Sequence, residues 1–119
     1  MQAVTLNKLE EMIWREYEKI PPERVYFTMK KMQLKRIRSE NVETMRFSLA
    51  LHKLGIFVTT HLIASLRGIS LTEALRHLHR LGDSKCLTLL RDGKGTANRW
   101  VVSSVFLESY GWKWEDHPG

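Results

Sequence analysis

The side chains of this 119-residue chain that could carry out chemistry are five histidines, one cysteine and a large set of basic residues. A metal site needs converging ligands, and His77 and His79 stand two positions apart, which directs them to different sides of a helix. His52, His61 and Cys86 lack the spacing of metal ligands, and no Ser/His/Asp or Cys/His order can be nominated. The sequence therefore predicts no enzyme, no metal site and no cofactor.

The basic residues are the more informative set. The chain has 19 lysines and arginines against 13 aspartates and glutamates, a net charge of +6, which favours an anionic partner. Residues 24–38 contain six basic residues and no acidic one, and residues 59–99 contain seven basic and three acidic residues, whereas both ends are net acidic. A surface shaped by solubility alone would mix the two signs, so the two blocks are candidate binding surfaces.

Length and composition indicate one globular domain, since 43% of the residues are apolar and 27% are charged. The longest uncharged run, Leu54 to the residue before Arg67, is shorter than the ~20 apolar residues that span a bilayer. The charged first 20 residues do not look like a secretory signal, and one cysteine excludes an intramolecular disulfide. We expect no membrane partner and a cytoplasmic, nucleoid-associated location, or a nuclear one in a eukaryote.

Apolar periodicity and capping residues predict the elements that position these side chains. A helix over 5–20 ends at Pro21-Pro22, and 23–37 is interpreted as a second helix, with a strand as the alternative. A third helix is predicted to begin at Ser39 or Asn41, either of which can cap it, and to end at Gly55. A short helix capped by Thr59 or Thr60 follows and ends at Gly68.

The last predicted helix begins at Ser70, with Glu73 completing a capping box, and ends at Gly82. Its inward stripe is Leu71, Ala74, Leu75, Leu78 and Leu81. Residues 86–90 and 99–105 are predicted to be the strands of a hairpin, joined by the turn-forming segment DGKGTAN.

The segment THLIASLRGISLTEALRHLHRL and the hairpin after it resemble a winged helix-turn-helix DNA-binding domain. The likeness covers roughly residues 40–105 and rests on Ala64 at the helix crossing, Gly68 in the turn, and Ile69 and Ala74 as inward positions. Two helices joined by a short turn leave no room for bulk where they cross. The wing-like pattern is Leu78, Leu81, Gly82, Leu87 to Leu90, Gly93 to Gly95, and Trp100.

The resemblance implies a mainly α fold with a small β-hairpin. It has a winged-helix core over 39–105, an N-terminal helical extension over 1–38 and an aromatic, acidic tail over 106–119. It also implies that residues 71–81 are a recognition helix in the major groove of double-stranded DNA, with the 91–99 wing on the backbone or minor groove.

The residues of the 71–81 helix outside its inward stripe are expected to face outward: Thr72, Glu73, Arg76, His77, His79 and Arg80. An arginine there can pair with guanine, and a threonine can reach a phosphate or a thymine methyl group. The candidate DNA-binding residues are Thr60, Ser70, Thr72, Arg76, His77, Arg80, Arg91, Lys94, Asn98 and Arg99, with Lys30, Lys31 and Lys35 from the first basic block. Arginines that serve only solubility are the alternative.

Two further questions stay open at the level of sequence. The 24–38 block either extends the DNA surface or pairs with the acidic residues of helix 5–20, and that helix either forms a homodimer, which would match a palindromic site, or packs in the core. The favoured function is sequence-specific DNA binding by a transcriptional regulator. The alternatives are a winged-helix protein-interaction module in a larger assembly, RNA binding, and a plasmid or viral replication or partition factor, because a fold does not fix a function.

Overall fold

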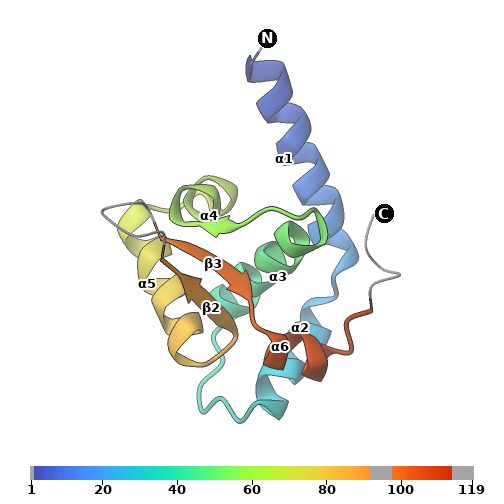
Figure 1. Ribbon diagram of the computed structural model, residues 1–119, viewed down its shortest axis with the longest axis vertical. Coiled ribbons are helices and arrows are strands. Elements are labelled where there is room, and N and C mark those ends of the chain that lie inside the picture. The colour runs from blue at the N-terminus through green and yellow to red at the C-terminus, as the bar shows by residue number, and fades with distance from the viewer. Residues whose placement is uncertain (1, 92–97, 114–119) are drawn as a thin grey trace.

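The computed structural model describes the backbone of residues 2–91 and 98–113 and the side chains from Lys8 onward within them. This part of the chain is mainly helical, with a small three-stranded antiparallel sheet (Figure 1), which confirms the predicted fold class at this level. In chain order the elements are α1 (Gln2–Lys19), α2 (Pro22–Lys31), α3 (Ser39–Lys53), β1 (Val58–Thr59), α4 (Thr60–Arg67), α5 (Leu71–Asp83), β2 (Leu87–Leu90), β3 (Arg99–Val102) and α6 (Ser104–Tyr110). Within residues 2–91 and 98–113, no helix has the length and apolar composition needed to cross a membrane.

Helix α3 lies at the centre of the fold because it is apolar on several sides. Met45, Phe47 and Leu49 are all fully buried, although Met45 and Phe47 project to opposite sides of the helix. The helix packs against α1, α2, α4 and α5, and it also contacts β1 and β3. A helix that is apolar on most sides has to be covered all round, so α3 positions the layers that surround it.

The C-terminal half of α1 packs on α3. Ile13 and Tyr17 are buried, and the Tyr17 ring stacks on Phe47 with 4.1 Å between the ring centroids. Lys53 Nζ lies 3.0 Å from Glu16 Oε1 and joins the two helices by an ion pair. The first helix therefore packs in the core, which was one of the two alternatives. A role of α1 in a homodimer stays a prediction.

The sheet has the strand order β1-β3-β2, and both pairings are antiparallel. Leu87 pairs with Val102 and Leu90 with Arg99, which confirms the predicted hairpin. Trp100 of the central strand is fully buried. The two-residue strand β1 was not predicted, because two residues are too few to show an alternating pattern. Most of the segment that joins the hairpin strands lies outside the described residues.

The predicted ends of α2 and α5 are wrong. Helix α2 ends at Lys31, not at residue 37, because Gln33 adopts a left-handed conformation with φ of 66°. Residues 32–38 then cross to α3 without regular structure. Helix α5 continues through Gly82 to Asp83, and Lys85, with φ of 70°, takes the left-handed position expected of a glycine.

The predicted strand 99–105 is also too long, because a helix begins inside it. Ser103 caps α6: its Oγ accepts a hydrogen bond from the Phe106 amide at 3.0 Å and donates one to Lys85 O at 2.6 Å. The branched residues of this segment resemble a strand, but the serine stops the strand and starts a helix.

Helix α6 packs against α2, so the beginning of the predicted tail belongs to the folded domain (Figure 1). Phe106 and Tyr110 are buried, the guanidinium of Arg24 lies 4.0 Å above the Tyr110 ring, and Arg24 Nη2 donates to Tyr110 O at 2.8 Å. Trp112 is half-buried, and its ring makes a T-shaped contact with the His52 ring, with 5.2 Å between the centroids.

Candidate nucleic-acid interface

Helix α4, the turn after it and the start of α5 form where the sequence predicted them. The Thr59 hydroxyl caps α4 by accepting from the Leu62 amide, and the Ser70 hydroxyl caps α5 by accepting from the Glu73 amide at 3.1 Å. Gly68 ends α4 with φ of 67°, a conformation that favours glycine. Gly68 and the Ser70 cap therefore fix where α4 ends and where α5 begins.

The outward face of α5 presents the predicted polar residues. Thr72 and Arg76 are exposed, and Arg76 Nη2 lies 3.4 Å from Glu73 Oε1 on the same helix. Arg80 is also exposed, and its Nη1 lies 3.8 Å from Glu40 Oε1. Exposed ion pairs at such distances contribute at most about 1 kcal/mol. Both guanidiniums can therefore exchange these carboxylates for a phosphate or a base edge.

His77 is not on this face, which corrects the prediction. Its side chain is 1% exposed, with Nδ1 2.7 Å from Arg67 Nη1 and Nε2 3.7 Å from Glu40 Oε2. Because the arginine can only donate, Nδ1 accepts the hydrogen bond, so the proton of the neutral ring sits on Nε2. Burial, and then the charge of Arg67, lowers the pKa of His77, while Glu40 opposes this shift.

The inward stripe of α5 was therefore misplaced by the sequence pattern. The buried residues are Ala74, His77, Leu78 and Leu81, whereas Leu71 and Leu75 are 47% and 37% exposed. At about 100° per residue, the centre of the buried stripe lies nearer to His77 than to Leu75. A leucine was expected inside and a histidine outside, but Arg67 gives Nδ1 of the buried histidine a hydrogen-bond partner. Nε2 has no hydrogen-bond partner among the described residues.

Arg67 joins three helices around His77. Its Nη1 also donates to Thr44 Oγ1 of α3 at 3.0 Å, and its Nη2 lies 3.9 Å from Glu43 Oε2. The network therefore fixes α4 and α5 against α3. The sequence pattern does not reveal this network, because the partners are far apart in the chain and no spacing rule connects them.

The hairpin carries the remaining predicted contacts of the second basic block. Arg91 is exposed directly after β2, Asn98 is half-buried directly before β3, and the Arg99 guanidinium lies 4.9 Å from the centre of the Phe57 ring. The loop-side end of the hairpin points to the same end of the molecule as the N-terminal turn of α5 (Figure 1). Lys94 lies outside the described residues.

The two remaining candidates from the helix–turn–helix are placed at the starts of helices. Thr60 is the first residue of α4 and is half-buried, and Ser70 is exposed with its hydroxyl occupied by the α5 cap. The Ser70 hydroxyl is thus committed to the local structure, and the Thr60 side chain is partly covered.

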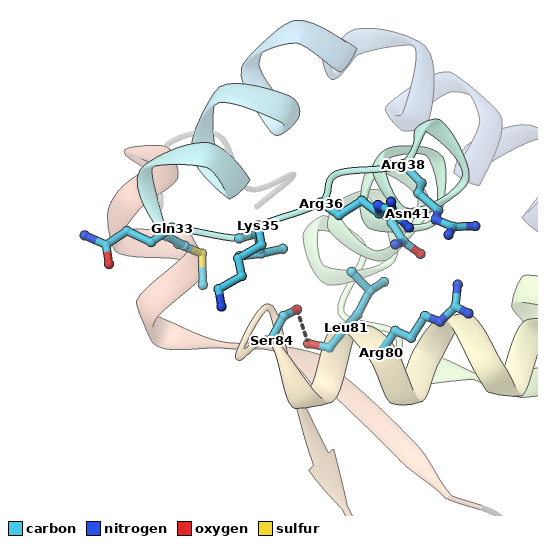
Figure 2. Close-up of a pocket in the computed structure, with 10 residues that line it drawn as sticks. Gln33, Lys35, Arg36, Arg38, Asn41, Arg80, Leu81 and Ser84 are labelled. Atoms are coloured by element: carbon cyan, nitrogen blue, oxygen red, sulfur yellow. Dashed lines mark hydrogen bonds between the residues drawn. The ribbon is translucent and has the colours of Figure 1, made fainter.

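The first basic block is divided between two places. Lys30 is exposed, and Lys31 Nζ donates to Ser109 O of α6 at 3.1 Å, so the end of α2 faces α6 and not α5. Lys35 instead lines a pocket with Arg36, Arg38 and Arg80 (Figure 2). The structure therefore brings part of the first block to the C-terminal half of α5. Arg36 and Arg38 were noted as part of the block but were not nominated as site residues.

No protein-family model matches the chain, and no curated protein and no solved structure shows a significant match to it. A functional conclusion therefore has to come from the arrangement of its own residues.

Proposed function

We propose that this chain is a winged helix-turn-helix protein that binds double-stranded DNA as a transcriptional regulator. In this proposal α5 enters the major groove, and the 91–99 end of the hairpin lies on the backbone or in the minor groove. The helix–turn–helix and the antiparallel hairpin after it, the elements on which the family resemblance rests, support it.

The observation that carries the proposal is the outward face of α5. Thr72, Arg76 and Arg80 lie on one side of a helix whose other side is buried by Ala74 and Leu78. A helix of this diameter fits a major groove about 12 Å wide. Because the buried side fixes the helix, the two guanidiniums are presented from a rigid element, as sequence-specific contacts require.

The test begins with selection of bound duplexes from random DNA, followed by fluorescence anisotropy titrations of the full chain with a selected duplex. The double variant Arg76→Ala/Arg80→Ala should bind at least about tenfold more weakly, because each arginine–base contact contributes about 1–3 kcal/mol. The matched control is Lys8→Ala/Arg15→Ala, which removes the same charge from exposed positions of α1. Equal affinities of the two double variants would refute the assignment of α5.

A homodimer formed through α1 is part of the same proposal. Met12 and Trp14 of α1 are 47% and 39% exposed and are available to a second copy. Sedimentation equilibrium of the full chain should give twice the mass of one chain. The variant Trp14→Glu should give a lower mass. A monomer at all concentrations would remove this part of the proposal.

A protein-interaction module is the second candidate function. It is favoured by an exposed aromatic pair on α2, where Phe27 is 58% exposed and packs edge-on against Tyr26. A DNA-binding protein should be retained on a DNA resin and released as salt rises through about 0.2–0.5 M, because binding releases counterions. Failure to bind this resin at low salt would favour the interaction module.

A further inference from the structure

A pocket lies between the irregular 32–38 segment and the C-terminal half of α5 (Figure 2). Its volume is about 460 Å³, within the range of about 300–1,000 Å³ that is usual for small-molecule sites. The polar side chains that line it are Lys35, Arg36, Arg38, Asn41, Arg80 and Ser84, together with Gln33 at one end. We call it the basic pocket.

The charge of the basic pocket is strongly positive. Four of its lining side chains are cationic and none is acidic. The nearest carboxylate that touches them is Glu40, whose Oε1 lies 3.9 Å from Arg38 Nη1 and 3.8 Å from Arg80 Nη1. One carboxylate oxygen thus holds two guanidiniums near each other, and Figure 2 shows Arg80 directed toward Arg38. A concave site with this excess of positive charge attracts an anion.

Asn41 gives a second and independent indication of a ligand. Its side chain lines the pocket and is only 8% exposed, yet its Oδ1 has no hydrogen-bond partner among the described residues. A buried acceptor without a partner is costly, and such groups are usually met by a donor. The lysine and arginines around it favour an anion, whereas this oxygen requires a hydroxyl or N–H group. The ligand must therefore carry both kinds of group.

We propose that the basic pocket binds a small phosphorylated ligand that also carries hydroxyl groups, of the sugar-phosphate or mononucleotide class. The guanidiniums of Arg36, Arg38 and Arg80 hold the phosphate, since a planar fork of donors matches its oxygens. A ligand hydroxyl donates to Asn41 Oδ1. A phosphate of the DNA backbone supplies the anion but not this donor, because deoxyribose lacks the 2′-hydroxyl.

Arg80 belongs both to the basic pocket and to the outward face of α5. A phosphate that engages Arg80 removes this guanidinium from the face that would contact DNA, so the ligand weakens DNA binding. This consequence rests on the proposed function, whereas ligand binding itself does not. Ligand binding measured in the absence of DNA therefore tests the basic pocket independently of the proposed function.

The test is calorimetric titration of the full chain with ribose 5-phosphate, ribose and inorganic phosphate. Ribose 5-phosphate should bind once per chain and at least about tenfold more tightly than inorganic phosphate, because only it satisfies Asn41. Ribose alone should not bind measurably. No saturable binding of ribose 5-phosphate, or equal affinity for the two phosphates, would overturn the proposal.

Two variants locate the site. Arg36→Ala/Arg38→Ala should lower the affinity for ribose 5-phosphate at least about tenfold. The control Lys8→Ala/Arg15→Ala, with the same change in charge, should leave this affinity unchanged. Asn41→Leu, of similar volume, should abolish the preference for ribose 5-phosphate over inorganic phosphate, with thermal unfolding as the check that it folds. If Arg36→Ala/Arg38→Ala lowers the affinity for a short DNA duplex but leaves the affinity for ribose 5-phosphate unchanged, the pocket contacts the DNA backbone and the proposal is wrong.

Discussion

The buried histidine of α5 makes the stability of the protein depend on pH in a way that one substitution can isolate. Burial and the neighbouring Arg67 disfavour the imidazolium form of His77 in the folded state. The unfolded chain, whose histidine pKa is about 6.5, therefore binds the proton more readily. The contribution of neutral His77 to the free energy of unfolding is therefore fully present above about pH 6.5. This contribution is lost as the pH decreases below that value.

The size of this loss has an upper limit. If His77 stays neutral in the folded state, the unfolded state gains about 1.4 kcal/mol on going from pH 7.5 to pH 5.5. Glu40, 3.7 Å from Nε2, stabilises the charged ring and makes the actual loss smaller. The loss should therefore be smaller than about 1.4 kcal/mol.

Urea unfolding followed by tryptophan fluorescence measures this term. The variant His77→Gln can still accept from Arg67 but does not titrate, so its unfolding free energy should change less between pH 7.5 and 5.5 than that of the natural chain. His61→Gln, at an exposed position of α4, is the control and should behave like the natural chain. A His77→Gln profile parallel to that of the natural chain would refute the reasoning.

Three further substitutions test how the fold holds α5 and α1. Ser70→Ala should lower the free energy of unfolding by about 1 kcal/mol in urea titrations, because the Glu73 amide loses its cap. Gly68→Ala should cost about 1 kcal/mol from backbone conformation alone, since no atom lies within 4 Å of the added carbon; an unchanged midpoint would contradict the left-handed turn. Lys53→Met should cost about 1–2 kcal/mol near pH 7. Burial raises the pKa of Glu16, but Lys53 and Lys19 outweigh it and the net pKa is lowered, so this cost should shrink in acid, as thermal unfolding at pH 7 and pH 3 can check.

The parts of the fold that the sequence predicted are those set by neighbouring residues. Gly68 and Ser70 mark the ends of two helices because a left-handed turn and an N-cap need particular residue types at single positions. The hairpin strands were similarly visible from their branched residues and the glycines between them. These signals are local, so one sequence suffices to find them.

The parts that were missed depend on partners distant in the chain. His77 is buried because Arg67 and Glu40 approach it from two other elements. The basic pocket forms because residues 32–38 meet Arg80, more than forty positions later. Charge counting found both basic blocks, but only the folded chain places Lys35 beside α5 and the end of α2 beside α6.

The most direct measurement of the central claim is the map of amide chemical-shift changes when a selected DNA duplex is added to the isotope-labelled full chain. The proposed function predicts the largest changes at Thr72, Arg76 and Arg80 of α5 and at Arg91 and Arg99 of the hairpin. Changes confined to α1 and α6, with the amides of α5 unmoved, would contradict it.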